Sequence, residues 1–207
     1  VVITHSHHDH IAGLPFLIEI RQHFKNFPLK IYGSTHTLDG LKNHIFNFVI
    51  WPDFTVIPSP EKPAMEYVEI GPEQSFELAG VRFSAVHTQH TVPTLGFILQ
   101  SQTGCLAFAG DTKNVGSVLD LASAQDMVLD HVIAEVSMSN ACEALAITTG
   151  HLTPRMIEKQ IRDLSDDVTV WLGFFKEWQR SKIETEMQQI QAACEVRLME
   201  RDLIFEF

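Results

Sequence analysis

Val1-Val2-Ile3-Thr4-His5-Ser6-His7-His8-Asp9-His10 is the stretch that decides the fold, because three apolar β-formers lead into an H-x-H-x-D-H arrangement. Imidazole nitrogen and carboxylate oxygen are the ligands that zinc and similar divalent ions accept. His5 and His7 alternate, so they point the same way in an extended segment, whereas the following turn directs Asp9 and His10 toward a second position nearby. The stretch predicts a buried strand that delivers ligands for two adjacent metal ions.

Two other interpretations of these histidines stay open: a solvated polar loop after a strand, or a histidine-rich accident such as a tag. The context favours ligands, since a strand precedes the motif and a turn at Gly13 and a new apolar run follow it. His8, at one of the x positions, is expected to be exposed.

The motif and its place after a strand resemble the metallo-β-lactamase-fold hydrolases. The resemblance implies an α/β (α+β) fold, an αββα sandwich with a one- or two-metal site at one edge. One or two divalent metal ions are implied, with zinc favoured and manganese or iron as alternatives. About two or three further strands are implied upstream of Val1, so we expect the numbering to begin inside the native protein and any targeting signal to lie outside it.

Length and charge limit the function classes. The 207 residues suffice for one domain, 1–207, with a sizeable core. Lys plus Arg number 15 and Asp plus Glu number 26, a formal net charge of −11. Nucleic-acid polymers are bound through many Lys and Arg contacts to phosphates, so no such partner is expected. A small anion remains compatible, because bound metal cations reverse the field locally.

Cysteines and hydropathy bear on the compartment. Cys105, Cys142 and Cys194 are odd in number and form no C-x-x-C pair, so neither a disulfide framework nor a thiolate zinc site is indicated. A reducing, cytoplasmic compartment fits this pattern. The sequence contains no apolar run of membrane-spanning length and no visible signal peptide, so no membrane partner is expected.

Periodicity along the chain predicts a β-rich part followed by α/β alternation, an order that suits the sandwich. Helices are expected at 11–24, 38–48, 115–122, 154–164 and 177–194. Strands are expected at 30–33, 67–70, 75–78, 81–86, 96–100, 105–109, 132–136, 168–172, 196–199 and 203–207.

Two later positions are candidates to complete the metal site. Asp111 follows the strand expected at 105–109, and in the resembled superfamily an aspartate there bridges two metals; an Asx-type turn is the alternative. The third imidazole of the first metal is expected at His90 or His87. The run from His90 to Phe97 resembles the H-x-x-x-x-x-[AG]-[FY] pattern of cyclic-nucleotide phosphodiesterase and ribonuclease Z relatives, which favours His90.

A further motif indicates the branch of the superfamily. Gly150-His151-Leu152-Thr153-Pro154 resembles a run of the class II 3′,5′-cyclic-nucleotide phosphodiesterases. Its last two residues fit a helix N-cap and first position, but that leaves His151 unexplained. The same branch is resembled by Phe46-Asn47-x-x-Ile50-Trp51-Pro52 and Ile133-Ala134-Glu135-Val136-Ser137. Aromatic residues lie more often in a core than in a pocket, so the run that begins at Phe46 is weak evidence for this branch by itself. The resemblance also implies a homodimer.

One residue departs from the resembled branch. The strand near Val170 should end in [TS]-H-[LIF]-K, whose histidine is the last ligand of the second metal, but Phe174 stands at that place. Phenylalanine cannot coordinate a metal, so the second ion keeps Asp9, His10 and Asp111 unless His151 or a water replaces the missing ligand. Weaker second-site binding, a one-metal enzyme and a degenerate member without turnover are the alternatives.

The expected function is metal-dependent hydrolysis of small-molecule 3′,5′-cyclic nucleotides, cAMP or cGMP, to 5′-nucleotides by a metal-activated water. The expected metal ligands are His5, His7, Asp9, His10, His90 and Asp111, and the candidate catalytic residues are His151, Asp9 and Glu135. His151 is expected to protonate the leaving 3′-oxygen and Glu135 to orient its ring; a surface or capping carboxylate is the alternative role of Glu135.

Three alternative functions stay open. The first is a ribonuclease Z-like nuclease, which shares the metal motif. The second is a degenerate metal- or ligand-binding scaffold without turnover, for which Phe174 is the evidence. The third is another lactamase-fold hydrolysis, such as that of a thioester or lactam, because a fold does not determine a function.

Overall fold

The structure, a computed structural model, describes residues 1–23, 28–200 and 202–205. The chain forms two compact units, Val1–Gly71 and Pro72–Phe207. Each unit has its own hydrophobic core. The single domain expected over 1–207 stays a prediction.

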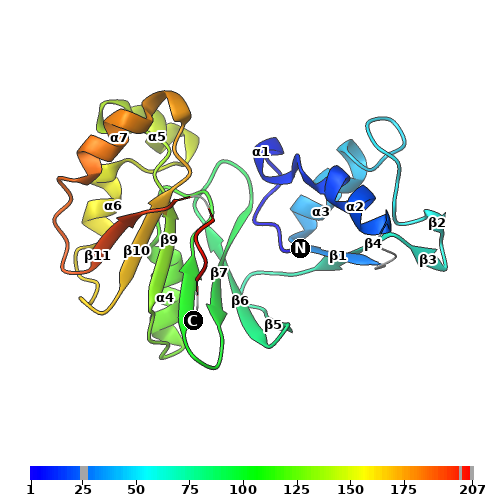
Figure 1. Ribbon diagram of the computed structural model, residues 1–207, viewed down its shortest axis with the longest axis horizontal. Coiled ribbons are helices and arrows are strands. Elements are labelled where there is room, and N and C mark those ends of the chain that lie inside the picture. The colour runs from blue at the N-terminus through cyan, green and yellow to red at the C-terminus, as the bar shows by residue number, and fades with distance from the viewer. Residues whose placement is uncertain (24–27, 201, 206–207) are drawn as a thin grey trace. The chain divides into compact units, whose positions relative to one another are not determined.

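The N-terminal unit packs helices on two parallel strands (Figure 1). Its elements are α1 (His8–Ile11), α2 (Leu14–His23), β1 (Leu29–Gly33), α3 (Thr35–His44), β2 (Pro58–Ser59), β3 (Lys62–Pro63) and β4 (Met65–Glu69). β1 pairs with β4 in parallel register, and β2 pairs with β3 in an antiparallel turn. The core of this unit includes one fully buried residue from each of α2, β1, α3 and β4, namely Ile18, Ile31, Leu41 and Met65.

The opening segment is shorter as a strand than its sequence predicts. Val2 forms a single parallel bridge with Tyr32 of β1. The Tyr32 N–H donates to the carbonyl of Val1 at 2.8 Å, and the Ile3 N–H donates to the carbonyl of Tyr32 at 2.9 Å. Of the three apolar residues only Ile3 is buried. This short pairing still fixes the chain immediately before His5.

Helix α3 begins and ends earlier than the expected range 38–48. Ser34 is its N-cap, and the Ser34 hydroxyl accepts a hydrogen bond from the Thr37 N–H at 3.3 Å. After His44 the side chain of Asn47 accepts hydrogen bonds from the N–H groups of Val49 and Ile50. Such side-chain acceptors compete with helical hydrogen bonding, so the aromatic run forms a turn instead of a last helical turn.

The C-terminal unit is built on a seven-stranded mixed sheet in the order β11-β10-β9-β8-β7-β6-β5. Its strands are β5 (Ser75–Leu78), β6 (Val81–Thr88), β7 (Thr94–Gln100), β8 (Cys105–Phe108), β9 (His131–Glu135), β10 (Thr169–Gly173) and β11 (Glu195–Leu198). Strands β5 to β8 pair antiparallel, and β8 to β11 pair parallel. The carboxyl ends of β8, β9 and β10 therefore meet at one edge of the sheet.

Helices cover one face of this sheet, as connections between parallel strands require. They are α4 (Gly116–Ala124), α5 (Glu143–Thr149), α6 (Pro154–Ile161) and α7 (Arg180–Met187), with 3₁₀ turns η1 (Asn140–Cys142) and η2 (Glu177–Gln179). The core between helices and sheet includes Val118, Ile157 and Ile183 from the helices and Val132 and Val170 from the strands. The opposite face carries a smaller cluster of Leu106, Ile133 and Trp171, against which Leu203 and Phe205 pack.

Two predicted elements of this unit differ from the structure, and one helix was not predicted. The helix expected at 177–194 is a 3₁₀ turn followed by α7, which ends at Met187. Helix α5 was not expected, because its apolar residues Leu145 and Ile147 are exposed and give no amphipathic pattern. The strand expected at 203–207 is absent over 203–205, and its last two residues lie outside the described part.

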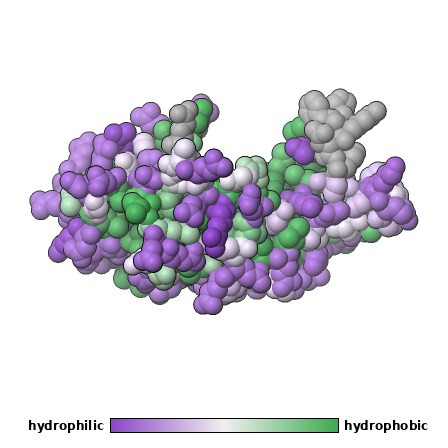
Figure 2. All heavy atoms as spheres, turned by 90° about the horizontal axis from the view of Figure 1, so that it is seen from below, coloured by the Kyte–Doolittle hydropathy of each residue, from purple (hydrophilic) through white to green (hydrophobic). Residues whose placement is uncertain are grey.

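Hydrophilic side chains cover most of the face drawn in Figure 2, and hydrophobic areas lie between them. Among the helices that the structure describes, none combines the length and the apolar composition that crossing a membrane requires.

Candidate metal centre

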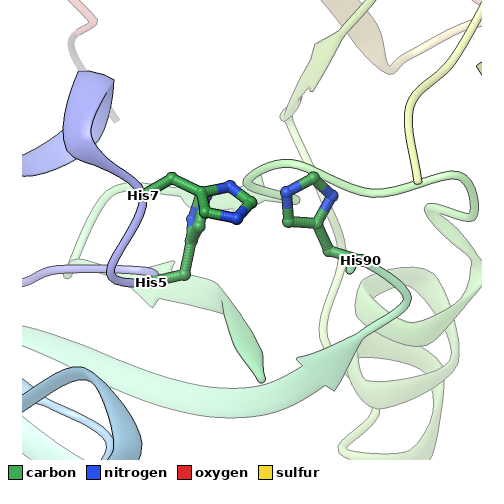
Figure 3. Close-up of side chains that lie close together, drawn as sticks. All are labelled: His5, His7 and His90. Atoms are coloured by element: carbon green, nitrogen blue, oxygen red, sulfur yellow. The ribbon is translucent and has the colours of Figure 1, made fainter. Parts of the chain in front are cut away.

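The N-terminal unit contributes a first set of nitrogen donors at the end of its opening segment. His5 is fully buried, and its Nε2 lies 3.1 Å from Nδ1 of His7. Figure 3 shows the His7 ring in front of the His5 ring. Nδ1 of His5 lies 3.0 Å from the Thr4 hydroxyl, which can accept a hydrogen bond from the Nδ1–H, so that Nε2 keeps its lone pair.

The spacing of these two nitrogens fits one tetrahedral metal ion. Two imidazole nitrogens at about 2.0–2.1 Å from zinc, separated by a tetrahedral angle, lie about 3.3–3.4 Å apart. The 3.1 Å between His5 and His7 is close to this separation. The donor types and their spacing therefore suit a divalent cation.

Asp9 and His10 follow on the short helix α1, which begins after His7. The centroids of the His5 and His10 rings are 4.2 Å apart. Nε2 of His10 is 3.9 Å from Oδ2 of Asp9, whose side chain is 65% exposed. The helical turn thus places His10 beside the first histidine and leaves the Asp9 carboxylate at the surface. His8 is exposed, which confirms the expectation for this position.

The C-terminal unit contributes a second donor set, which begins at His90. His90 lies in the loop after β6 and its side chain is 1% exposed, whereas His87 is exposed on β6 itself. The Nδ1–H of His90 donates to the carbonyl of Gly150 at 2.9 Å, and Figure 3 shows the ring at the end of its loop. This bond leaves Nε2 as the nitrogen that can bind a metal.

Asp111 and His151 lie next to this nitrogen. Oδ2 of Asp111 is 4.0 Å from Nε2 of His90 and 3.9 Å from Nδ1 of His151. Ligand atoms of the three residues all lie within 4.8 Å of one another. Asp111 follows the end of β8, and His151 lies in the loop between α5 and α6. Two imidazoles and a carboxylate so grouped are a donor set of the kind that holds divalent metals.

Glu135 orients His151. The Nδ1–H of His151 donates to Oε1 of Glu135 at 2.7 Å, and the carboxylate is fully buried. Oε2 of Glu135 accepts from the Ser137 N–H at 2.8 Å, and Oε1 also accepts from the Thr112 N–H at 3.4 Å. These donors stabilise the charged carboxylate. Because Nδ1 of His151 is bound to Glu135, the other ring nitrogen, Nε2, is left for chemistry outside the pair.

The charge around His151 favours its protonated form. Burial lowers the pKa of His151, but the hydrogen bond and charge of Glu135 and the charge of Asp111 raise it, and the net effect is a raised pKa. The positive charge of Lys176 acts in the opposite direction.

Gly150 places His90 in this arrangement. It ends α5 in the left-handed conformation, with φ 71°. A Cβ at this position would lie 2.8 Å from Nδ1 of His90 and 2.9 Å from its Cα, so only glycine fits. The sequence alone does not predict this role for Gly150, although a glycine directly before His151 is a typical helix C-terminal signal. Thr4, Thr112 and Ser137 were missed as well, because their contacts depend on the fold.

Phe174 stands at the end of β10, where the resembled branch has a histidine. Its φ is 62°, and its ring packs edge-on against Phe108, with centroids 6.3 Å apart. Its side chain supplies no metal ligand. The expected ligands and proton donor thus fall into two sets, His5, His7, Asp9 and His10 in one unit and His90, Asp111, Glu135 and His151 in the other.

Comparison with known proteins identifies the family of this chain. The family model described as the beta-lactamase superfamily domain matches residues 1–174. A probable 3′,5′-cyclic-nucleotide phosphodiesterase from Yersinia pestis is 28% identical over 176 residues, 78% of this chain and 50% of the relative. A 3′,5′-cyclic-nucleotide phosphodiesterase from Aliivibrio fischeri is 30% identical over 184 residues, 79% of this chain and 52% of the relative. The chain thus spans about half the length of these curated relatives.

A solved structure agrees in fold. The metallo-β-lactamase fold protein YhfI from Bacillus subtilis superposes with a TM-score of 0.73 at 15% identity, covering 97% of this chain and 73% of that one. An identity this low supports the architecture, an α/β sandwich with mixed sheets, and not the substrate.

Proposed function

The chain belongs to the metallo-β-lactamase superfamily, and from this premise we propose that it is a metal-dependent phosphodiesterase that hydrolyses 3′,5′-cyclic nucleotides to 5′-nucleotides. The observation that carries the proposal is the pair of the half-buried His151 and the buried Glu135 beside Asp111 and His90. It supplies an oriented acid next to metal donors, which is what cleavage of a phosphodiester with a poor leaving group requires. The two phosphodiesterase relatives support the substrate class.

We assign metal binding to His5, His7, Asp9, His10, His90 and Asp111. One or two divalent ions, with zinc favoured, would lower the pKa of a bound water to about 7 and neutralise charge on the phosphoryl oxygens. The hydrogen bonds between His5 and Thr4 and between His90 and Gly150 would keep the imidazoles in the tautomer that ligation needs.

His151 would donate its Nε2 proton to the leaving 3′-oxygen. Glu135 holds Nδ1–H at 2.7 Å, so the ring cannot rotate freely and the Nε2–H stays directed away from the carboxylate. The charge of Glu135 also stabilises the imidazolium that must be present before transfer. The pair therefore performs proton transfer without being a metal ligand in this proposal.

The decisive test is conversion of 3′,5′-cyclic AMP to 5′-AMP by the purified full-length protein. Zinc or manganese is supplied in one arm and a chelator in the other. Turnover that the chelator abolishes and added metal restores is expected. Metal-loaded protein that leaves cyclic AMP intact, with cyclic GMP tested in parallel, would overturn the proposal.

Phe174 favours a second candidate, a metal-binding scaffold that has lost turnover. Its side chain cannot replace the missing ligand of a second ion. The variant Phe174→His distinguishes the two cases, because it supplies the missing imidazole. The fold should tolerate it, since histidine is favoured over phenylalanine at a positive φ. Hydrolysis that appears only in this variant would establish the scaffold, whereas hydrolysis by the wild-type chain would exclude it.

A further inference from the structure

Phe174 is a large apolar residue that the fold keeps at the surface. The residue is 51% exposed, and its φ is 62°. A bulky side chain at such a φ is an outlier, because the left-handed region crowds Cβ against the backbone. Backbone preference therefore does not explain phenylalanine here, and burial explains only part of it. Strained positions of this kind concentrate where a protein binds ligands.

The backbone around Phe174 is held rigidly against the end of β9. The Val136 N–H donates to the carbonyl of Gly173 at 2.9 Å, and the Ser137 hydroxyl donates to the carbonyl of Phe174 at 3.3 Å. The Lys176 N–H donates to the carbonyl of Ser137 at 3.1 Å. These three bonds fix the direction in which the ring of Phe174 leaves the chain.

The ring stands at the sheet edge that carries the second donor set. β9 and β10 lie side by side (Figure 1), and Gly173 pairs with Glu135 in their register. The Phe174 and Phe108 rings form a T-shaped pair with an interplanar angle of 86°, and Phe108 ends the strand that leads to Asp111. Ligands of α/β proteins bind at the carboxyl ends of parallel strands, which is where this half-exposed ring lies.

A cation accompanies the aromatic ring. Lys176 follows Phe174 by two residues, and its positive charge lowers the pKa of His151. Glu177 and Trp178 come next and are both exposed. Glu177 lies 3.6 Å from the guanidinium of Arg180, so its negative charge is paired. The positive charge of Lys176 beside an aromatic ring suits a small ligand with an aromatic group and an anion better than a wholly apolar partner.

We propose that Phe174 is the base-recognition residue of this site: a nucleobase stacks on its exposed ring while Lys176 attracts the phosphate. The inference rests on the proposed function and specifies how the nucleotide is recognised. Bases stack on aromatic side chains because both present a flat π-face, and lysine is a common partner of phosphate. Phenylalanine at position 174 would then contribute to substrate binding at the position where the resembled branch has a histidine.

The test compares two ligands that differ only in the base. Isothermal titration of the metal-loaded full chain uses 5′-AMP and ribose 5-phosphate. Stacking of one base is expected to make 5′-AMP bind about 5- to 150-fold more tightly. Phe174→Gly should abolish this preference, and it suits the fold because glycine adopts the same φ without strain. Phe174→Tyr should retain the preference.

Two further variants locate the effect. Lys176→Gln should weaken both ligands by a similar factor and leave their ratio unchanged. Trp178→Ala removes another exposed aromatic ring from the same stretch of chain and should change neither affinity. If the base preference survives Phe174→Gly, or disappears in Trp178→Ala instead, the assignment to Phe174 is wrong.

Failure of this inference can be told apart from failure of the proposed function. Hydrolysis of cyclic AMP with an unchanged KM and an unchanged ligand ratio in Phe174→Gly would leave the phosphodiesterase and remove the base-recognition role. A base preference that depends on Phe174 in a protein without turnover would support the base-recognition role and overturn the phosphodiesterase proposal.

Discussion

His151 is the residue at which proton transfer and metal binding can be separated. The Nδ1 of its ring is occupied by Glu135, and its neighbour Asp111 is the expected ligand. Replacement of His151 by Ala is expected to lower kcat by about two to four orders of magnitude with metal content unchanged. Turnover and bound metal, measured by elemental analysis, are compared on the same preparation. Loss of metal in proportion to activity would identify His151 as a ligand and remove its role as proton donor.

Gly150 provides a second test at the level of one residue. Gly150→Ala introduces a Cβ 2.8 Å from Nδ1 of His90, in addition to the backbone cost of φ 71°. The backbone conformation alone is expected to cost about 1–2 kcal/mol; the contact with His90 should add to this loss and weaken metal binding. Gly80→Ala is the matched control, since Gly80 has φ 81° but no atom within 4 Å of the place that the added methyl group would take.

The two glycine variants should therefore differ in both measurements. Denaturant unfolding is expected to show the larger loss of stability in Gly150→Ala, because its added Cβ also comes within 2.9 Å of the His90 backbone, whereas Gly80→Ala carries only the cost of the positive φ. Titration with zinc should show reduced affinity in Gly150→Ala alone. Equal zinc affinities would mean that the position of His90 does not depend on Gly150.

The residues that a sequence can identify are those whose chemistry is unusual in itself. The donors His5, His7, His90 and Asp111, and the pair Glu135 and His151, could all be nominated from residue type and motif context. The carbonyl of Gly150 and the N–H groups of Thr112 and Ser137 could not, because every residue has such groups and only the fold selects among them.

Helix α3 illustrates how element boundaries depend on side-chain hydrogen bonds. Ser34→Ala removes the acceptor of the Thr37 N–H and the partner of the Thr37 hydroxyl, which lies 3.0 Å from the Ser34 oxygen. We expect the free energy of unfolding to fall by about 1–2 kcal/mol, measured by urea titration. Ser34→Thr, which retains the acceptor, should lose less. A Ser34→Ala protein as stable as wild type would show that the cap contributes nothing.

The longest error in the predicted elements also has a physical cause. Residues 177–194 have helical composition, but the side chain of Gln179 is buried and accepts a hydrogen bond from the Ser139 N–H at 2.8 Å. This tertiary bond accompanies a 3₁₀ turn at the start of the segment. At the other end, Met187 is the last residue that α7 buries. Helical propensity is a weak preference, which tertiary contacts override.

The strands of the C-terminal unit were easier to predict. Alternation and turn residues mark β5 to β8, and continuous apolar runs mark the parallel strands β9 and β10, which are buried on both faces. The opening segment of the chain is the exception, because only one bridge defines it.

For the molecule as a whole, bound metal should add to stability. Metal that binds only the folded chain, at a concentration 100-fold above its Kd, contributes about 2.7 kcal/mol. For a chain of this size the corresponding rise in Tm is roughly 5–10 °C. Thermal scans with zinc, with manganese and with chelator test this expectation. The same Tm in all three conditions would be inconsistent with a metal site in the folded protein.

The net charge of −11 makes a separate prediction about substrates. A surface with this balance repels a polyanion, so no binding of tRNA is expected at about 150 mM salt, whereas a small nucleotide is still bound by the metal-loaded site. Fluorescence anisotropy with labelled tRNA provides the measurement. Micromolar binding of tRNA under these conditions would revive the ribonuclease Z-like alternative.

The two outermost strands of the large sheet have a consequence for how the protein behaves at high concentration. β5 and β11 are four residues long, and they carry Glu77 at one edge and the ion-paired Glu195 and Arg197 at the other. A second chain could add to either edge only by stripping water from these charges along a very short row of free backbone groups. Both edges therefore disfavour edge-to-edge aggregation, and the seven-stranded sheet has no long apolar margin from which a fibril could grow.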